Sequence, residues 1–184
     1  EKRLLWLVPL VIFIIFVLLY FVFHSVIESL LVMLSVPFAL TGGVFLLVLL
    51  GYHWSVAVWV GFIALFGIAV ETGVVMVVYL HEALDEKLAS GLVGTAELHQ
   101  ATLDGAVLRL RPKLMTVGTS LLGLIPVMVS TGTGSDLMRP IATPLVGGLL
   151  TSAMHVLIVT PVIFAIMKER AIRRGTLQKS RMSF

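Results

Sequence analysis

Residues 56–80 read VAVWVGFIALFGIAVETGVVMVVYL, an apolar run in which Glu71 is the only charged side chain. A helix of about 20 such residues crosses the roughly 30 Å hydrocarbon core of a bilayer, so the run predicts a transmembrane helix. Because a charge at the bilayer centre costs roughly 2.5–3.5 kcal/mol, we expect Glu71 to be functional. A proton relay is the leading hypothesis, and an acid bonded to a neighbouring Ser or Thr is the alternative.

The composition of the whole chain is that of a membrane protein. Of its 184 residues, 59% are hydrophobic and 12% are charged, whereas soluble domains have about 25% charged residues. The apolar residues form long runs instead of alternating, which favours a helical bundle over an outer-membrane barrel. Cysteine is absent, which excludes disulfides and thiolate chemistry.

No enzymatic motif is present in the sequence. It contains no glycine-rich phosphate loop, no HExxH zinc motif and no Ser/His/Asp spacing typical of hydrolases. We therefore expect no enzymatic activity, no bound cofactor and no nucleic-acid partner.

Five long apolar runs predict five transmembrane helices and thus an all-α membrane protein. Three of them, at residues 4–23, 27–50 and 56–80, make up a first region (1–80), and two, at about 114–130 and 142–167, make up a second region (114–167). Paired glycines at 42–43 and 147–148 are expected to let two helix backbones approach closely.

Basic residues concentrate in two polar segments, a linker at 81–113 and a tail at 168–184, which hold ten of the 13 Lys and Arg residues. The positive-inside rule then predicts a cytoplasmic linker and C-terminus, and five spans put the N-terminus in the periplasm. Residues 95–110 show a moderate amphipathic pattern, which predicts a helix along the membrane interface, with a solvated connector as the alternative. The opening Glu1-Lys2-Arg3 resembles an arbitrary start, so we expect the chain to be part of a longer protein.

Two further residues are candidates for a site. Lys113 follows Pro112, which suits the first turn of a helix, so its ammonium is expected near the cytoplasmic face. It either pairs with Glu71 or serves only as a positive-inside residue. Met138 lies in a predicted external loop at 130–140, STGTGSDLMRP. Its thioether would suit Cu(I) or Ag(I), although methionine is more often apolar filler.

The remaining titratable residues carry less weight. We expect His24 and Glu28 to lie in a short solvated cytoplasmic turn, and His155 to pack among apolar neighbours.

Four strings, in this order along the chain, resemble the C-terminal membrane domain of the heavy-metal efflux branch of the resistance-nodulation-division family. They are SVPFALTGGVF (35–45), GFIALFGIAVETGVVMVVYL (61–80), GAVLRLRPKLMT (105–116) and TGTGSDLMRPIATPLVGGL (131–149). The resemblance is strongest to the family's copper and silver pumps. It implies the last five of twelve transmembrane helices in a trimeric inner-membrane proton antiporter, which exports metal through a periplasmic porter domain, an adaptor and an outer-membrane channel.

The resemblance also implies residue roles. Glu71 and Lys113 match positions of the family's proton relay, and Met138 matches a methionine that passes Cu(I) or Ag(I) along in the copper and silver pumps. The family's first seven helices, with a further relay acid, and both porter segments have no counterpart in these residues. We therefore expect that the chain alone does not transport.

Two other functions are compatible with the same sequence. One is a fragment of a drug exporter of the same superfamily, although the lysine of the RPK string and the SDLM string argue against it. The other is a truncated helical bundle in the membrane with no transport role.

Overall fold

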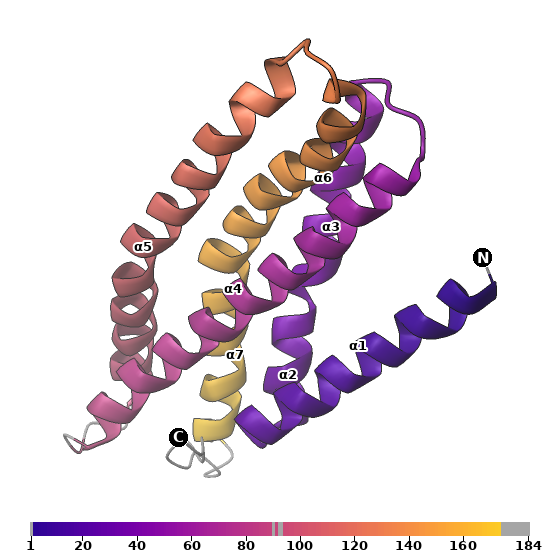
Figure 1. Ribbon diagram of the computed structural model, residues 1–184. Helices are drawn as coiled ribbons and strands as arrows, with labels where there is room; N and C mark the ends of the chain where they lie inside the picture. The colour runs from indigo at the N-terminus through magenta and orange to yellow at the C-terminus, as the bar shows by residue number, and fades with distance from the viewer. Residues whose placement is uncertain (1, 90, 92–93, 174–184) are drawn as a thin grey trace.

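The structure is a computed structural model that describes residues 2–89, 91 and 94–173, with side chains from Pro9 onward. In this part of the chain all regular structure is helical (Figure 1), which confirms the predicted fold class. The elements are α1 (Lys2–Phe23), α2 (Val26–Met33), α3 (Ser35–Leu49), α4 (Val56–Ala89), α5 (Thr95–Val129), α6 (Ser135–Met154), the π-helical turn η1 (His155–Val159) and α7 (Thr160–Arg173). They form the five predicted helical segments, because α2 leads into α3, and α6 leads through η1 into α7.

Four of these segments are long and apolar enough to cross a membrane: Val26–Leu49, Val56–Ala89, Thr95–Val129 and Ser135–Arg173. α1 adds a shorter apolar stretch, Pro9–Phe23. Successive segments run in opposite directions (Figure 1). The α3–α4 and α5–α6 connections therefore lie at one end of the bundle, and the junction of α1 with α2 lies at the other end, with the last turn of α7.

The second segment bends between α2 and α3, at Leu34. Pro37 explains the bend, because a proline offers no N–H to the carbonyl four residues earlier and its ring crowds that carbonyl. At the bend the Ser35 hydroxyl lies 3.0 Å from the carbonyl oxygen of Ala69 in α4. The bend thus lets a buried serine connect the second and third segments.

Close backbone contact between α3 and α6 depends on glycine. A Cβ atom added at Gly42 would lie 2.5 Å from the carbonyl oxygen of Gly147, closer than real Cβ atoms approach a neighbouring atom. Both residues are buried. The sequence prediction that paired glycines bring two backbones together is confirmed.

α4 and α5 extend into the segment that the sequence assigned to a linker. α4 continues to Ala89, and α5 runs without interruption from Thr95 to Val129. Residues 95–110 are therefore the first part of a long helix, where the sequence suggested a separate interfacial helix. Packing explains the difference, since Leu98 is buried in one apolar cluster with Leu80 and Leu84 of α4. α5 therefore continues through Pro112, which the sequence placed at a helix start.

A π-helical turn interrupts the last segment. Its hydrogen bond runs from the N–H of Thr160 to the carbonyl oxygen of His155, five residues back, whereas an α-helix uses the residue four back. α7 then continues to Arg173. The first residues of the predicted basic tail are thus helical, and residues 174–184 lie outside the described part.

Candidate functional site

Lys113 points into the bundle from α5. The residue is only 2% exposed, although Pro112 before it and Leu114 after it are exposed. Its Nζ donates a hydrogen bond of 2.8 Å to Thr72 Oγ1 of α4, and that hydroxyl in turn donates to the carbonyl oxygen of Ile68 at 2.7 Å. The Lys113 ammonium is therefore directed toward α4 and away from the exposed face of α5.

Glu71 lies on an exposed face of α4, next in sequence to the threonine that receives Lys113. Its carboxylate is near enough to attract the Lys113 ammonium, and the Arg109 guanidinium is near enough to repel it. Within the described residues, Glu71 and Lys113 form no ion pair of 4.0 Å or less. The two relay candidates are therefore neighbours around Thr72 without direct contact.

The exposed face around Glu71 is apolar apart from this acid. Gly67 and Ile63, one and two turns before it, are also exposed, and a Cβ atom added at Gly67 would have no neighbour within 4 Å. On the other side of the helix, Gly73 packs against Val32 and Ser35. Only one of the two glycines that flank Glu71 is thus used for packing between the described helices.

Met138 lies at the opposite end of the bundle from the start of α5. It belongs to the first turn of α6, which begins at Ser135, and its N–H donates to the carbonyl oxygen of Gly134 at 3.1 Å. Its side chain is 57% exposed. The structure therefore does not bring Met138 together with Glu71 and Lys113, and the loop predicted at 130–140 is shorter, ending before Ser135.

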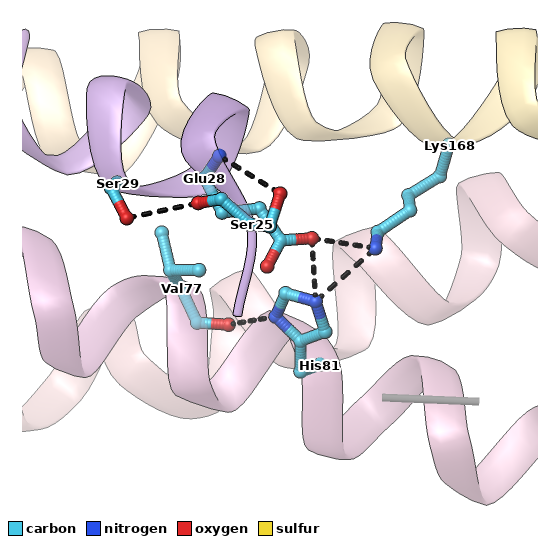
Figure 2. Close-up of polar contacts among 6 residues, drawn as sticks. All are labelled: Ser25, Glu28, Ser29, Val77, His81 and Lys168. Atoms are coloured by element: carbon cyan, nitrogen blue, oxygen red, sulfur yellow. Dashed lines mark hydrogen bonds and ion pairs between the residues drawn. The ribbon is translucent and has the colours of Figure 1, made fainter. Parts of the chain in front are cut away.

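A second charged cluster was missed by the sequence reasoning. Glu28, expected in a solvated turn, is only 6% exposed, and its Oε1 lies 3.0 Å from His81 Nε2 and 2.8 Å from Lys168 Nζ. Lys168 Nζ also lies 3.2 Å from His81 Nε2. Figure 2 shows the three side chains converging from α2, α4 and α7. We call Glu28, His81 and Lys168 the triad.

The expectation that Glu28 is solvated is wrong because the turn before it is shorter than hydropathy indicated. Ser25 caps α2, accepting a hydrogen bond from the N–H of Glu28 at its Oγ (Figure 2). The carboxylate is thereby directed toward α4 and α7. Two signals could have found this: the S-x-x-E spacing of Ser25 and Glu28, typical of a helix start, and the predicted topology, which puts all three triad residues at one membrane face.

His155 behaves as the sequence predicted. It is 2% exposed, and its ring stacks on Phe38 of α3 with 4.2 Å between ring centroids. Within the described residues neither ring nitrogen has a hydrogen-bond partner. The packing interpretation of this histidine is confirmed.

Comparison with known proteins shows which proteins this chain is similar to. Residues 1–168 match the AcrB/AcrD/AcrF family. The chain is 45% identical over 170 residues to the cation efflux system protein CusA of Escherichia coli (strain K12), covering 91% of this chain and 16% of that protein. It is 40% identical over 164 residues to the cobalt-zinc-cadmium resistance protein CzcA of Cupriavidus metallidurans, covering 89% of this chain and 15% of that protein.

A solved structure agrees with the sequence comparison. The crystal structure of a heavy metal efflux pump (crystal form II) superimposes with a TM-score of 0.77 at 36% sequence identity, covering 92% of this chain and 16% of that chain. The chain thus spans about one sixth of the length of the proteins that it matches.

Proposed function

Because this chain belongs to the AcrB/AcrD/AcrF family, we propose that it is the C-terminal membrane part of a proton-driven pump that exports heavy-metal cations, with Cu(I) and Ag(I) as its substrates. Its relatives support the cation class, since two are named for cation efflux and for cobalt, zinc and cadmium resistance. In this proposal the pump is a homotrimer of the bacterial inner membrane, completed by an N-terminal half, a porter domain, an adaptor and an outer-membrane channel.

The observation that carries the proton hypothesis is the buried Lys113 ammonium beside Glu71. Removing such a charge from water is unfavourable unless it has polar partners, and Lys113 has the Thr72 hydroxyl. A carboxylate that gains a proton loses its attraction for a nearby cation. Proton binding at Glu71 would therefore change the charge balance around Lys113 and Thr72, and this is the step that a proton-coupled pump requires.

The exposed face of α4 supports a place for the missing half of the pump. Glu71 lies there with apolar neighbours, and a carboxylate facing lipid would be costly. In the proposed pump, helices outside this chain cover Glu71 and supply the second acid of the relay. The same assembly would cover α5. Only 11% of the residues in its most apolar stretch are buried in the described bundle.

Substitution of Glu71 by Gln in the assembled pump tests this mechanism. Glutamine keeps the shape of the side chain but takes up no proton, so we expect metal resistance of the host and metal-driven proton flux in vesicles to be lost. Glu82→Gln is the matched control, because Glu82 is an exposed acid on the same helix, and it should leave both measurements unchanged. Full resistance and flux in Glu71→Gln would remove Glu71 from the mechanism.

Met138 provides the test of the metal. A thioether binds soft cations such as Cu(I) and Ag(I), so Met138→Leu in the assembled pump should lower silver and copper tolerance at least several-fold. Met154→Leu is the control, since Met154 lies on the same helix and is 65% exposed against 57% for Met138. Unchanged silver tolerance in Met138→Leu would favour a drug exporter over a copper and silver pump.

A further inference from the structure

The triad joins three helices that are far apart in sequence. Glu28 comes from α2, His81 from α4 and Lys168 from α7, and the contacts between them are 2.8, 3.0 and 3.2 Å long. The side chains of Glu28 and His81 are 8% and 3% exposed. Lys168 is more accessible, with 16% of its side chain exposed.

The hydrogen bonds of His81 restrict where its protons can lie. Nδ1 lies 3.0 Å from the carbonyl oxygen of Val77 (Figure 2), and a carbonyl only accepts, so Nδ1 must carry a proton in every state. Nε2 is then the variable atom. Without a proton it accepts a hydrogen bond from Lys168, and with a proton it donates to Glu28.

The two protonation states of His81 differ in which side chain binds the Glu28 carboxylate. When His81 is neutral, Lys168 binds both Glu28 and His81, and the triad has one negative charge on Glu28 and one positive charge on Lys168. When Nε2 gains a proton, two cations face a single carboxylate in a buried setting, which is unfavourable. Lys168 can relieve the excess charge, because its long side chain is already partly exposed and can turn its ammonium toward water.

We propose that His81 is a proton-binding site, separate from Glu71, at which proton uptake by Nε2 transfers the Glu28 carboxylate from Lys168 to His81 and releases α7 from α2. Aromatic rings from two other helices flank His81. From α1 the ring of Phe23 faces His81, with 6.5 Å between ring centroids, and from α7 the ring of Phe164 meets it edge-on at 5.0 Å.

Few charged side chains face His81 from the described elements that pack around it. α2 contributes Glu28 and α7 contributes Lys168, whereas α5 meets this apolar cluster through Leu98 and Ala101. On α4 itself Asp85 is partly exposed one turn after His81, and Glu82 is exposed. Imidazole is the side chain that ordinarily changes its charge between about pH 5 and pH 8, so acidification over this range is the condition that tests the proposal.

Nitrogen NMR on the full chain in lipid nanodiscs tests the proton site without altering the triad. The chain is labelled with ¹⁵N-histidine, and the signals of its five histidines are assigned by replacing the four others by Gln, one at a time. At about pH 8 we expect His81 to carry a proton on Nδ1 only, and at about pH 5 on both nitrogens. A single unchanged tautomer across this range, or a proton on Nε2 alone, would overturn the proposal.

Electron-spin distance measurements test the release of α7. The chain has no cysteine, so labels on Ile27→Cys in α2 and Arg170→Cys in α7, both exposed positions, report on this pair alone. We expect the distance distribution to lengthen and broaden on acidification, and to lose this response in His81→Gln. His24→Gln replaces an exposed histidine near α2 and should respond like the parent.

An equal response to pH in His81→Gln and the parent, or no response in the parent, would contradict the release of α7. The NMR experiment measures proton binding, and the spin labels measure helix position, in the chain itself. They remain valid whether or not the assembled pump transports metal, so failure of the triad proposal and failure of the proposed function can be told apart.

Discussion

Lys113 has one hydrogen-bonding neighbour in the described part of the chain, the hydroxyl of Thr72. At the scale of single residues this makes Thr72 the support of a buried cation. Hydrogen bonds to charged groups contribute about 1.5–3 kcal/mol, so Thr72→Val, which keeps the shape and removes the hydroxyl, should lower the free energy of unfolding by about 2 kcal/mol. Chemical unfolding of the chain in detergent micelles measures this loss.

Two controls make that measurement specific. Thr72→Ser keeps the hydroxyl and should stay close to the parent. In a Lys113→Met background the cation is gone, so the effect of Thr72→Val should shrink, as expected for residues in direct contact. A chain in which Thr72→Val costs the same with and without Lys113 would show that the threonine acts through its own packing.

At the scale of elements, the contact between α3 and α6 is the most sensitive to added volume. A Cβ atom at Gly147 would lie 2.8 Å from the Cβ of Leu46 and even closer to the backbone of Gly42, and backbone atoms cannot rotate away. Extra volume in a tightly packed region costs about 1–3 kcal/mol, so we expect Gly147→Ala to lower the unfolding free energy by that amount in the same micelle assay. Gly123→Ala in α5 is the control, because its Cβ would have no neighbour within 4 Å. Equal stability of both variants would contradict the close approach.

At the scale of the whole molecule, the alternation of the helices allows the predicted orientation to be tested. Single cysteines replacing His53 or Thr133 lie in the α3–α4 and α5–α6 connections, and one replacing His24 lies at the opposite end. With the C-terminus in the cytoplasm, a membrane-impermeant maleimide added to cells with a permeabilised outer membrane should label the first two and not the third. Labelling of the His24 cysteine alone would contradict the predicted orientation.

Part of the fold of the whole molecule could be predicted from the sequence. The number of helical segments followed from apolar runs, because hydrocarbon thickness fixes how many residues a crossing needs. The ends of the helices could not be predicted in this way. Hydropathy detects where polar residues begin, whereas a helix ends where its backbone hydrogen bonds end. α4 continues nine residues past Leu80 for this reason.

The candidate site was predictable to a lesser degree. Glu71 became a candidate because an ionisable residue inside an apolar run is unusual, and Lys113 because it lies where such a run begins; their roles stay predictions. The triad was missed because His81 and Lys168 lie 53 and 140 residues after Glu28. No local sequence pattern reveals which helix ends will meet. The sequence also could not show whether Glu71 lies on an exposed or a buried face of α4, because that depends on how α2 and α5 pack against the helix.

The π-helical turn at His155–Val159 has a consequence for how this segment can change over time. Each residue of an α-helix rotates the chain by about 100°, and the turn winds in one residue more than an α-helical turn would. It therefore fixes the angular setting of α7, including the direction in which Lys168 projects. A lineage that lost a single residue there would keep its hydropathy profile, its length within one position and its composition, yet would aim that ammonium away from Glu28. Gain or loss of one residue in this short stretch could thus connect or disconnect the last helix from its neighbours without altering any charged residue.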